Sequence, residues 1–176
     1  MADISRVALF GKLNSLCYRA IESSTVFCKL RGNPYVELVH WMHQILQLQD
    51  SDLMRIVRHY EIDAATLARD LTAALDRLPR GSTSVTDLSS QLEESVERAW
   101  VYGTLLFGES QVRSGHLIVG LLKTPGLRNA LYAMSKQFER IKLEHLSDNF
   151  ARLLGESPEA RLVATDGFSG GGAAPG

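Results

Sequence analysis

The strongest constraint on the fold is a helical pattern of apolar residues that occurs twice along the chain. Up to about residue 155, apolar side chains recur every three or four positions, as in amphipathic α-helices, and no segment alternates with the period of a strand. Sliding the sequence along itself by 79 positions aligns the halves without a gap, so that Leu38 falls on Leu117 and Pro79 on Pro158. We therefore predict an all-α fold of two pseudo-twofold-related four-helix repeats that share one core and follow a short extra N-terminal helix.

Composition and turn residues divide the chain into five parts. Residues 1–13 are predicted to form the extra helix, and residues 14–79 and 90–160 the two repeats. Residues 80–89 are predicted to be a loop, because Gly, Ser and Thr crowd their first half. Residues 161–176 are rich in Gly and Ala, which predicts a flexible linker.

Side chains that can cap helices predict where several helices begin. Asn14 separates the extra helix from the first long one, because Asn accepts hydrogen bonds from the N–H groups of a first turn. Asn33 followed by Pro34 predicts the start of another helix. Ser90 and Glu93 have the spacing of a capping box and predict the start of the second repeat.

Charge and hydropathy disfavour several classes of protein. The chain has 19 Lys and Arg against 20 Asp and Glu, without a basic stripe, so we expect no nucleic-acid partner. No apolar stretch approaches the ~20 residues of a membrane-spanning helix, and the first residues do not resemble an export signal. Cys17 and Cys28 lie roughly 16 Å apart on one predicted helix, too far for a disulfide. These features predict a cytoplasmic protein with no membrane partner.

No pattern of residues predicts a catalytic or metal site. The sequence contains no phosphate-binding loop of the Gly-x-x-x-x-Gly-Lys-Ser/Thr type and no Gly-x-Ser-x-Gly elbow. Glu37, His40 and His43 could share one helix face, but the 79-residue offset places no matching ligands opposite them. His59 and His145 have no companions that the sequence reveals. We expect no catalytic residue, metal or cofactor, although a helical metalloenzyme stays open as an alternative.

Several segments resemble a known family. The segment 113–122, in which a polar turn leads into His-Leu-x-x-x-Leu-Leu, is similar to the Clp amino-terminal domain, and the segment 33–42 has similar spacing. Within that family, the segment 9–17 and the Arg-Ala-Trp at 98–100 resemble the ClpV branch, the AAA+ ATPases of type VI secretion. The resemblance covers about residues 5–160.

The resemblance implies a function in recognising substrate. It implies that the domain binds a helix near the N-terminus of the small sheath subunit and recruits contracted sheath for ATP-driven disassembly. ATP and Mg²⁺ are then expected only in ATPase modules, whose motifs this sequence lacks. The isolated domain is expected to be a monomer and its parent a hexamer.

The partner site is predicted where the extra helix meets the first long helix. Because Asn14 can break the two helices apart, the short one can fold back and leave an apolar groove for a partner helix. The groove residues, chosen by helical phase, are Ile4, Val7, Ala8, Phe10, Leu13, Leu16 and Cys17.

Three alternatives to this interpretation remain open. The first apolar side chains could simply close the end of the bundle. The groove could instead lie in the cleft between the repeats. The domain could also be mainly architectural, or an adaptor-docking module of a chaperone ring.

Overall fold

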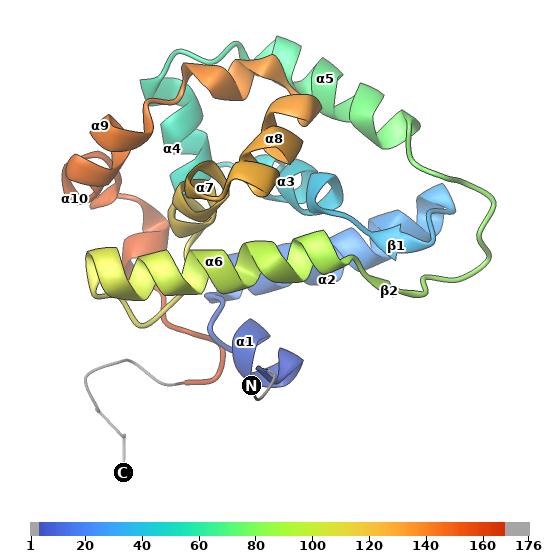
Figure 1. Ribbon diagram of the computed structural model, residues 1–176, viewed down its shortest axis with the longest axis horizontal. Coiled ribbons are helices and arrows are strands. Elements are labelled where there is room, and N and C mark those ends of the chain that lie inside the picture. The colour runs from blue at the N-terminus through green and yellow to red at the C-terminus, as the bar shows by residue number, and fades with distance from the viewer. Residues whose placement is uncertain (1–3, 168–176) are drawn as a thin grey trace.

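A computed structural model describes residues 4–167 of the 176-residue chain. Helices predominate in this part, which confirms the predicted all-α class (Figure 1). The α-helices are α1 (Arg6–Phe10), α2 (Ser15–Arg31), α3 (Leu38–Leu46), α4 (Asp52–His59), α5 (Ala64–Asp76), α6 (Ser90–Phe107), α7 (Ser114–Lys123), α8 (Pro125–Met134), α9 (Leu143–Asp148) and α10 (Phe150–Leu154). The other elements are the 3-10 helices η1 (Lys136–Arg140) and η2 (Pro158–Arg161) and the strands β1 (Tyr35–Val36) and β2 (Asp87–Leu88).

Two similar units follow α1, and their helix ends show how they correspond. The long helices α2 and α6 end at Gly32 and Gly108, which have left-handed φ angles of 72° and 63°. The helices that follow, α3 and α7, begin beside His40 and His116, and the Nδ1 atom of each accepts a backbone N–H hydrogen bond. Both pairs of residues are 76 positions apart, so the predicted gapless offset of 79 is wrong for this half of each unit. The offset of 79 holds later, between the starts of α5 and α9.

The offset changes because the units join their middle helices differently. Residues 47–51 separate α3 from α4, whereas only Thr124 separates α7 from α8. The second unit then inserts η1 before α9, which restores the longer spacing. A gapless comparison therefore detects the duplication but misaligns its first helices.

The predicted helix start at Asn33 and Pro34 is wrong. Helix α3 begins at Leu38, because the residues before it are extended as β1 and pair in parallel with β2. Asn33 instead donates from its amide nitrogen to the Pro79 carbonyl over 2.8 Å and contacts His40 Nε2 over 2.9 Å. Its polar side chain thus bridges two segments of the unit rather than capping a helix.

The predicted caps at Asn14 and Ser90 have different outcomes. Asn14 caps α2 as predicted, and its Oδ1 accepts a hydrogen bond from Cys17 N over 2.9 Å. Ser89, not Ser90, caps α6, and its hydroxyl accepts from Leu92 N over 3.1 Å. Two consecutive serines leave the cap ambiguous by one residue when only sequence is considered.

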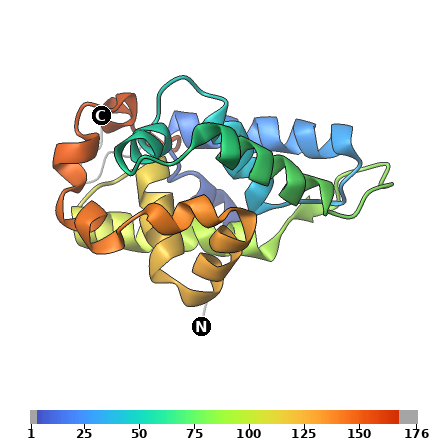
Figure 2. The same ribbon diagram turned by 90° about the horizontal axis from the view of Figure 1, so that it is seen from above.

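Short backbone pairings tie the units together. β1, which precedes α3, pairs with β2, which precedes α6. Reciprocally, Leu13 before α2 forms a parallel bridge with Val112 before α7. The loop that carries β2 projects from one edge of the domain in both views (Figures 1 and 2). The crossed pairings place both units over one core, where Leu38 and Leu117 are both fully buried.

A buried ionic network joins helix starts from both units. Arg113 donates from Nε and Nη2 to the two carboxylate oxygens of Asp52, over 2.8 and 2.9 Å. The carboxylate of Glu159 in η2 accepts hydrogen bonds from Asp52 N over 2.6 Å and from Ser114 N over 2.7 Å. Buried carboxylates need such donors, so the Glu159 side chain anchors η2 to the starts of α4 and α7.

The segment after η2 differs from the predicted flexible linker of residues 161–176. Ala164 forms an antiparallel bridge with Asn14, and its side chain is buried. The backbone pairings continue as far as Asp166. The chain is thus packed against its own beginning through residue 166, while residues 1–3 and 168–176 lie outside the described residues.

Candidate functional site

Helix α1 carries both buried and exposed apolar side chains. The hydroxyl of Ser5 caps its first turn by accepting a hydrogen bond from Ala8 N. Leu9 and Phe10 are buried against the domain, whereas Val7, about one turn before Phe10, is 85% exposed. An exposed apolar side chain at the edge of an apolar hollow indicates a surface that another chain could cover.

A groove of about 700 Å³ runs between α1, α2, β2 and the C-terminal segment. Figure 1 shows α1 at the end of the domain where the first and last described residues lie. The groove is lined by Arg6, Val7, Phe10, Gly11, Tyr18, Ile21, Glu22, Thr25, Leu88, Thr165 and Asp166.

The floor of the groove is apolar and is built largely by α2. Tyr18, Ile21 and Thr25 are spaced by three and four residues, so they lie on one face of the helix. Ile21 and Phe10 are each 7% exposed, which means that their inner surfaces already belong to the core. This floor suits the apolar stripe of an amphipathic helix, which docks through anchors at similar spacing.

Arg6 and Asp166 at the rim pair with charged neighbours. Arg6 Nη1 lies 2.7 Å from Asp87 Oδ1, and Arg6 also pairs with Glu93. The hydrogen bond from Arg6 lowers the pKa of the Asp87 carboxyl. Lys12 Nζ lies 2.9 Å from Asp166 Oδ2 at another edge. Because Arg6 and Asp166 are paired, the apolar floor is the main feature that would attract a partner.

The structure separates the seven predicted groove residues into three groups. Val7 and Phe10 line the groove. Ile4 and Ala8 are exposed near it without lining it. The other three do not face the groove: Leu13 and Cys17 are fully buried, and Leu16 lines a separate hollow between α2 and the loop after α3.

Sequence reasoning missed much of the lining. Tyr18, Ile21 and Thr25 share a face of α2 that begins one residue after Cys17 and runs about two turns further, so the phase of Leu16 and Cys17 did not reveal it. Nothing in the sequence signals Leu88 or Thr165, which reach the groove through pairings between distant segments.

The histidines have structural partners in the described part of the chain. His40 caps α3, and His43 stacks on Phe27 with ring centroids 5.0 Å apart. His59 and His145, which seemed isolated in the sequence, stack on each other with centroids 5.4 Å apart. Among residues 4–167, no three His, Cys, Asp or Glu side chains are grouped to hold a metal.

Burial raises the pKa of the Cys17 thiol well above its ordinary value, so this cysteine is a poor nucleophile. Among the described residues, no helix combines the length and the apolar character that spanning a bilayer would need.

Comparison with known proteins identifies relatives of this chain. Residues 12–134 match the Clp repeat (R) N-terminal domain family. The whole chain is 68% identical to the AAA+ ATPase ClpV1 of Pseudomonas aeruginosa and covers 19% of that protein. The chain thus spans about a fifth of the length of the curated relatives it matches.

Solved structures share this fold. One solved structure comes from a study of the coevolution of the ATPase ClpV, the TssB-TssC sheath and the accessory HsiE protein. It is 69% identical to this chain, and the two superpose with a TM-score of 0.87 over 90% of this chain and 98% of that one. Another, described as a complex of a ClpV N-domain with a VipB peptide, is 23% identical with a TM-score of 0.78, over 90% of this chain and 97% of that one. The predicted resemblance is confirmed: the chain belongs to the Clp repeat N-terminal domain family.

Proposed function

We propose that this domain binds an amphipathic helix of a type VI secretion sheath subunit in the groove between α1 and α2. The observation that carries the proposal is the apolar floor of this groove beside the exposed Val7. The relative with a VipB peptide supports a peptide ligand for this fold, and the similarity to ClpV1 supports the sheath as its source.

The size and lining of the groove suit one face of a helix rather than a whole domain. A helix with side chains is about 10–12 Å wide, so the groove can accept its apolar stripe while the polar face remains in water. Each buried Val- or Leu-sized anchor contributes about 1.5–3 kcal/mol, and ordering and association oppose this gain. A few such anchors favour a moderate affinity, which suits a partner that must later be released.

In the complete protein, we propose that the domain selects the sheath and that separate modules supply ATP hydrolysis. The domain itself acts by binding, without a metal or nucleotide of its own. We further propose that it works in the cytoplasm, as a monomer when isolated and as part of a hexamer in its parent.

A fluorescence-anisotropy titration tests the proposal. Labelled peptides from the N-terminal helices of both sheath subunits are titrated with the 176-residue chain, and scrambled peptides of equal composition serve as controls. We expect saturable binding of an authentic peptide and none of its scrambled form. No saturable binding at hundreds of micromolar would contradict the proposal, and concentration-dependent oligomers in sedimentation would favour an architectural role instead.

A further inference from the structure

One wall of the groove comes from the far end of the chain. After η2 the chain turns back toward α1, where Thr165 N donates to the Leu13 carbonyl over 2.8 Å and Asp166 N to the Gly11 carbonyl over 2.9 Å. The side chains of Thr165 and Asp166 both line the groove. A segment about 150 residues from α1 in sequence therefore shapes the same surface as α1.

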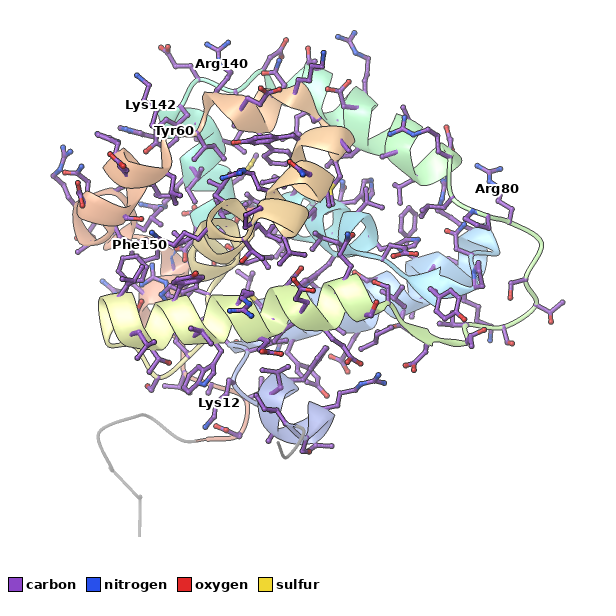
Figure 3. All side chains as sticks on the ribbon, in the orientation of Figure 1. Lys12, Tyr60, Arg80, Arg140, Lys142 and Phe150 are labelled. Atoms are coloured by element: carbon purple, nitrogen blue, oxygen red, sulfur yellow. The ribbon has the colours of Figure 1, made fainter. Side chains whose placement is uncertain are left out.

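Side-chain contacts hold this wall at the end of α1. The carboxylate of Asp166 lies 2.9 Å from Lys12 Nζ, and the two side chains are 24% and 27% exposed. Lys12 also lies over the Trp100 ring of α6, 5.3 Å from its centroid, and Figure 3 shows Lys12 at the α1 end of the domain. The Thr165 hydroxyl donates to the Gly11 carbonyl over 3.1 Å. A half-buried ion pair of this kind stabilises modestly, so the wall can open without unfolding the domain.

The wall is anchored upstream and exposed where it reaches the groove. Glu159 is fully buried beneath the starts of α4 and α7, which fixes the beginning of the segment. Val163, Thr165 and Asp166 are exposed, whereas the side chain of Ala164 is buried. Detaching residues 164–166 thus removes one side of the groove and exposes one small buried side chain, that of Ala164.

We propose that residues 164–166 form one wall of the partner site and contact the bound helix. The pairing of Asp166 with Lys12 positions this wall and thereby helps to set the affinity for the partner helix. This inference rests on the proposed function and deepens it. A docked helix that touches Thr165 and Asp166 holds the wall closed, and a closed wall strengthens docking. Thermodynamic linkage requires that the two effects be equal in size.

Point variants of the full 176-residue chain test the affinity half of the inference. Thr165→Pro removes the N–H that bonds the Leu13 carbonyl, and Asp166→Asn removes the charge that pairs with Lys12. We expect peptide binding to weaken about tenfold in Thr165→Pro and about threefold in Asp166→Asn, with Asp166→Glu restoring most of the affinity. Val163→Ala is the matched control, because Val163 lies in the same segment but does not line the groove. Thermal melts verify that each variant remains folded.

Hydrogen exchange tests the linkage half in the parent protein. At saturating peptide, we expect the amides of Thr165 and Asp166 to exchange more slowly, by about the same factor that Thr165→Pro loses in affinity. If the parent binds peptide while these amides exchange unchanged and Thr165→Pro binds equally well, the wall has no part in recognition and the inference is wrong. If the parent binds no peptide, the proposed function itself fails, so the two failures are distinguishable.

Discussion

A charge placed in the groove should abolish recognition while leaving the domain folded. Val7 and Val26 are both exposed on helices, at 85% and 61%, but only Val7 lines the groove. Val7→Asp and Val26→Asp therefore introduce the same side chain at two similar surface positions. The pair separates an effect on binding from a general effect of an added acid.

The magnitude follows from what surrounds each side chain in the free and bound states. Because both positions face water in the free domain, each substitution should change the free energy of unfolding by about 0.5 kcal/mol or less. Under a docked helix, Asp at position 7 forfeits the apolar contact of Val and must lose water from its carboxylate. A combined cost of at least about 2 kcal/mol corresponds to roughly thirtyfold weaker binding.

The assay is anisotropy with a labelled sheath peptide, together with circular-dichroism melts. We expect Val7→Asp to bind at least about thirtyfold more weakly than the parent, Val26→Asp to bind normally, and both to melt near the parent temperature. Equal binding by Val7→Asp, or an equal loss in Val26→Asp, would refute the reasoning and direct attention to the cleft between the units.

Three further predictions concern the scaffold. Glu61 has a left-handed φ of 53°, so Glu61→Gly should relieve backbone strain and raise the unfolding free energy in urea by about 0.5–1 kcal/mol; no gain would contradict this account. A Cβ at Gly120 would lie 2.9 Å from Ala99 N, so Gly120→Ala should force α6 and α7 apart and lower stability by about 1–3 kcal/mol; a melting temperature at or above the parent's would show that the helices adjust freely. Burial lowers the pKa of His40 to about 4, below the ~6.5 of an unfolded His, so the unfolded state binds more protons between these values. Stability should fall as pH drops from 6.5 toward 4, by up to about 1.4 kcal/mol per unit, and His40→Gln should flatten this slope; an unchanged slope would assign it to other groups.

Sequence patterns predicted the helical class and the duplication. A helix with one buried face has apolar residues every three to four positions, and this pattern does not depend on the lengths of the loops. The offset between the units was wrong for the first helices, since a gapless comparison cannot represent the different loops at residues 47–51 and at Thr124. The start of α3 was also wrong, because β1 is fixed by pairing with a segment about 50 residues away. Local propensity carries no information about such a contact.

Two of the seven predicted site residues, Val7 and Phe10, line the candidate groove, and binding of a partner there stays a prediction. Asn14 caps α2 after α1 has ended at Gly11, and the groove lies between the two helices. Leu13 lies between α1 and α2, and Cys17 lies on the inner face of α2, so helical phase alone included two fully buried side chains. Thr165 was beyond reach of the sequence, since its segment was predicted to be flexible and its position depends on backbone pairing with Leu13.

Mapping of amide chemical shifts during titration with the sheath peptide tests the central claim most directly. The groove predicts saturable shifts at α1, at Tyr18–Thr25 of α2 and at Thr165, with no shifts around His59 and His145 at the opposite side of the domain. Figure 3 marks that opposite side by Tyr60, Arg140 and Lys142. Shifts confined to those residues, with α1 and α2 unchanged at saturation, would contradict the account.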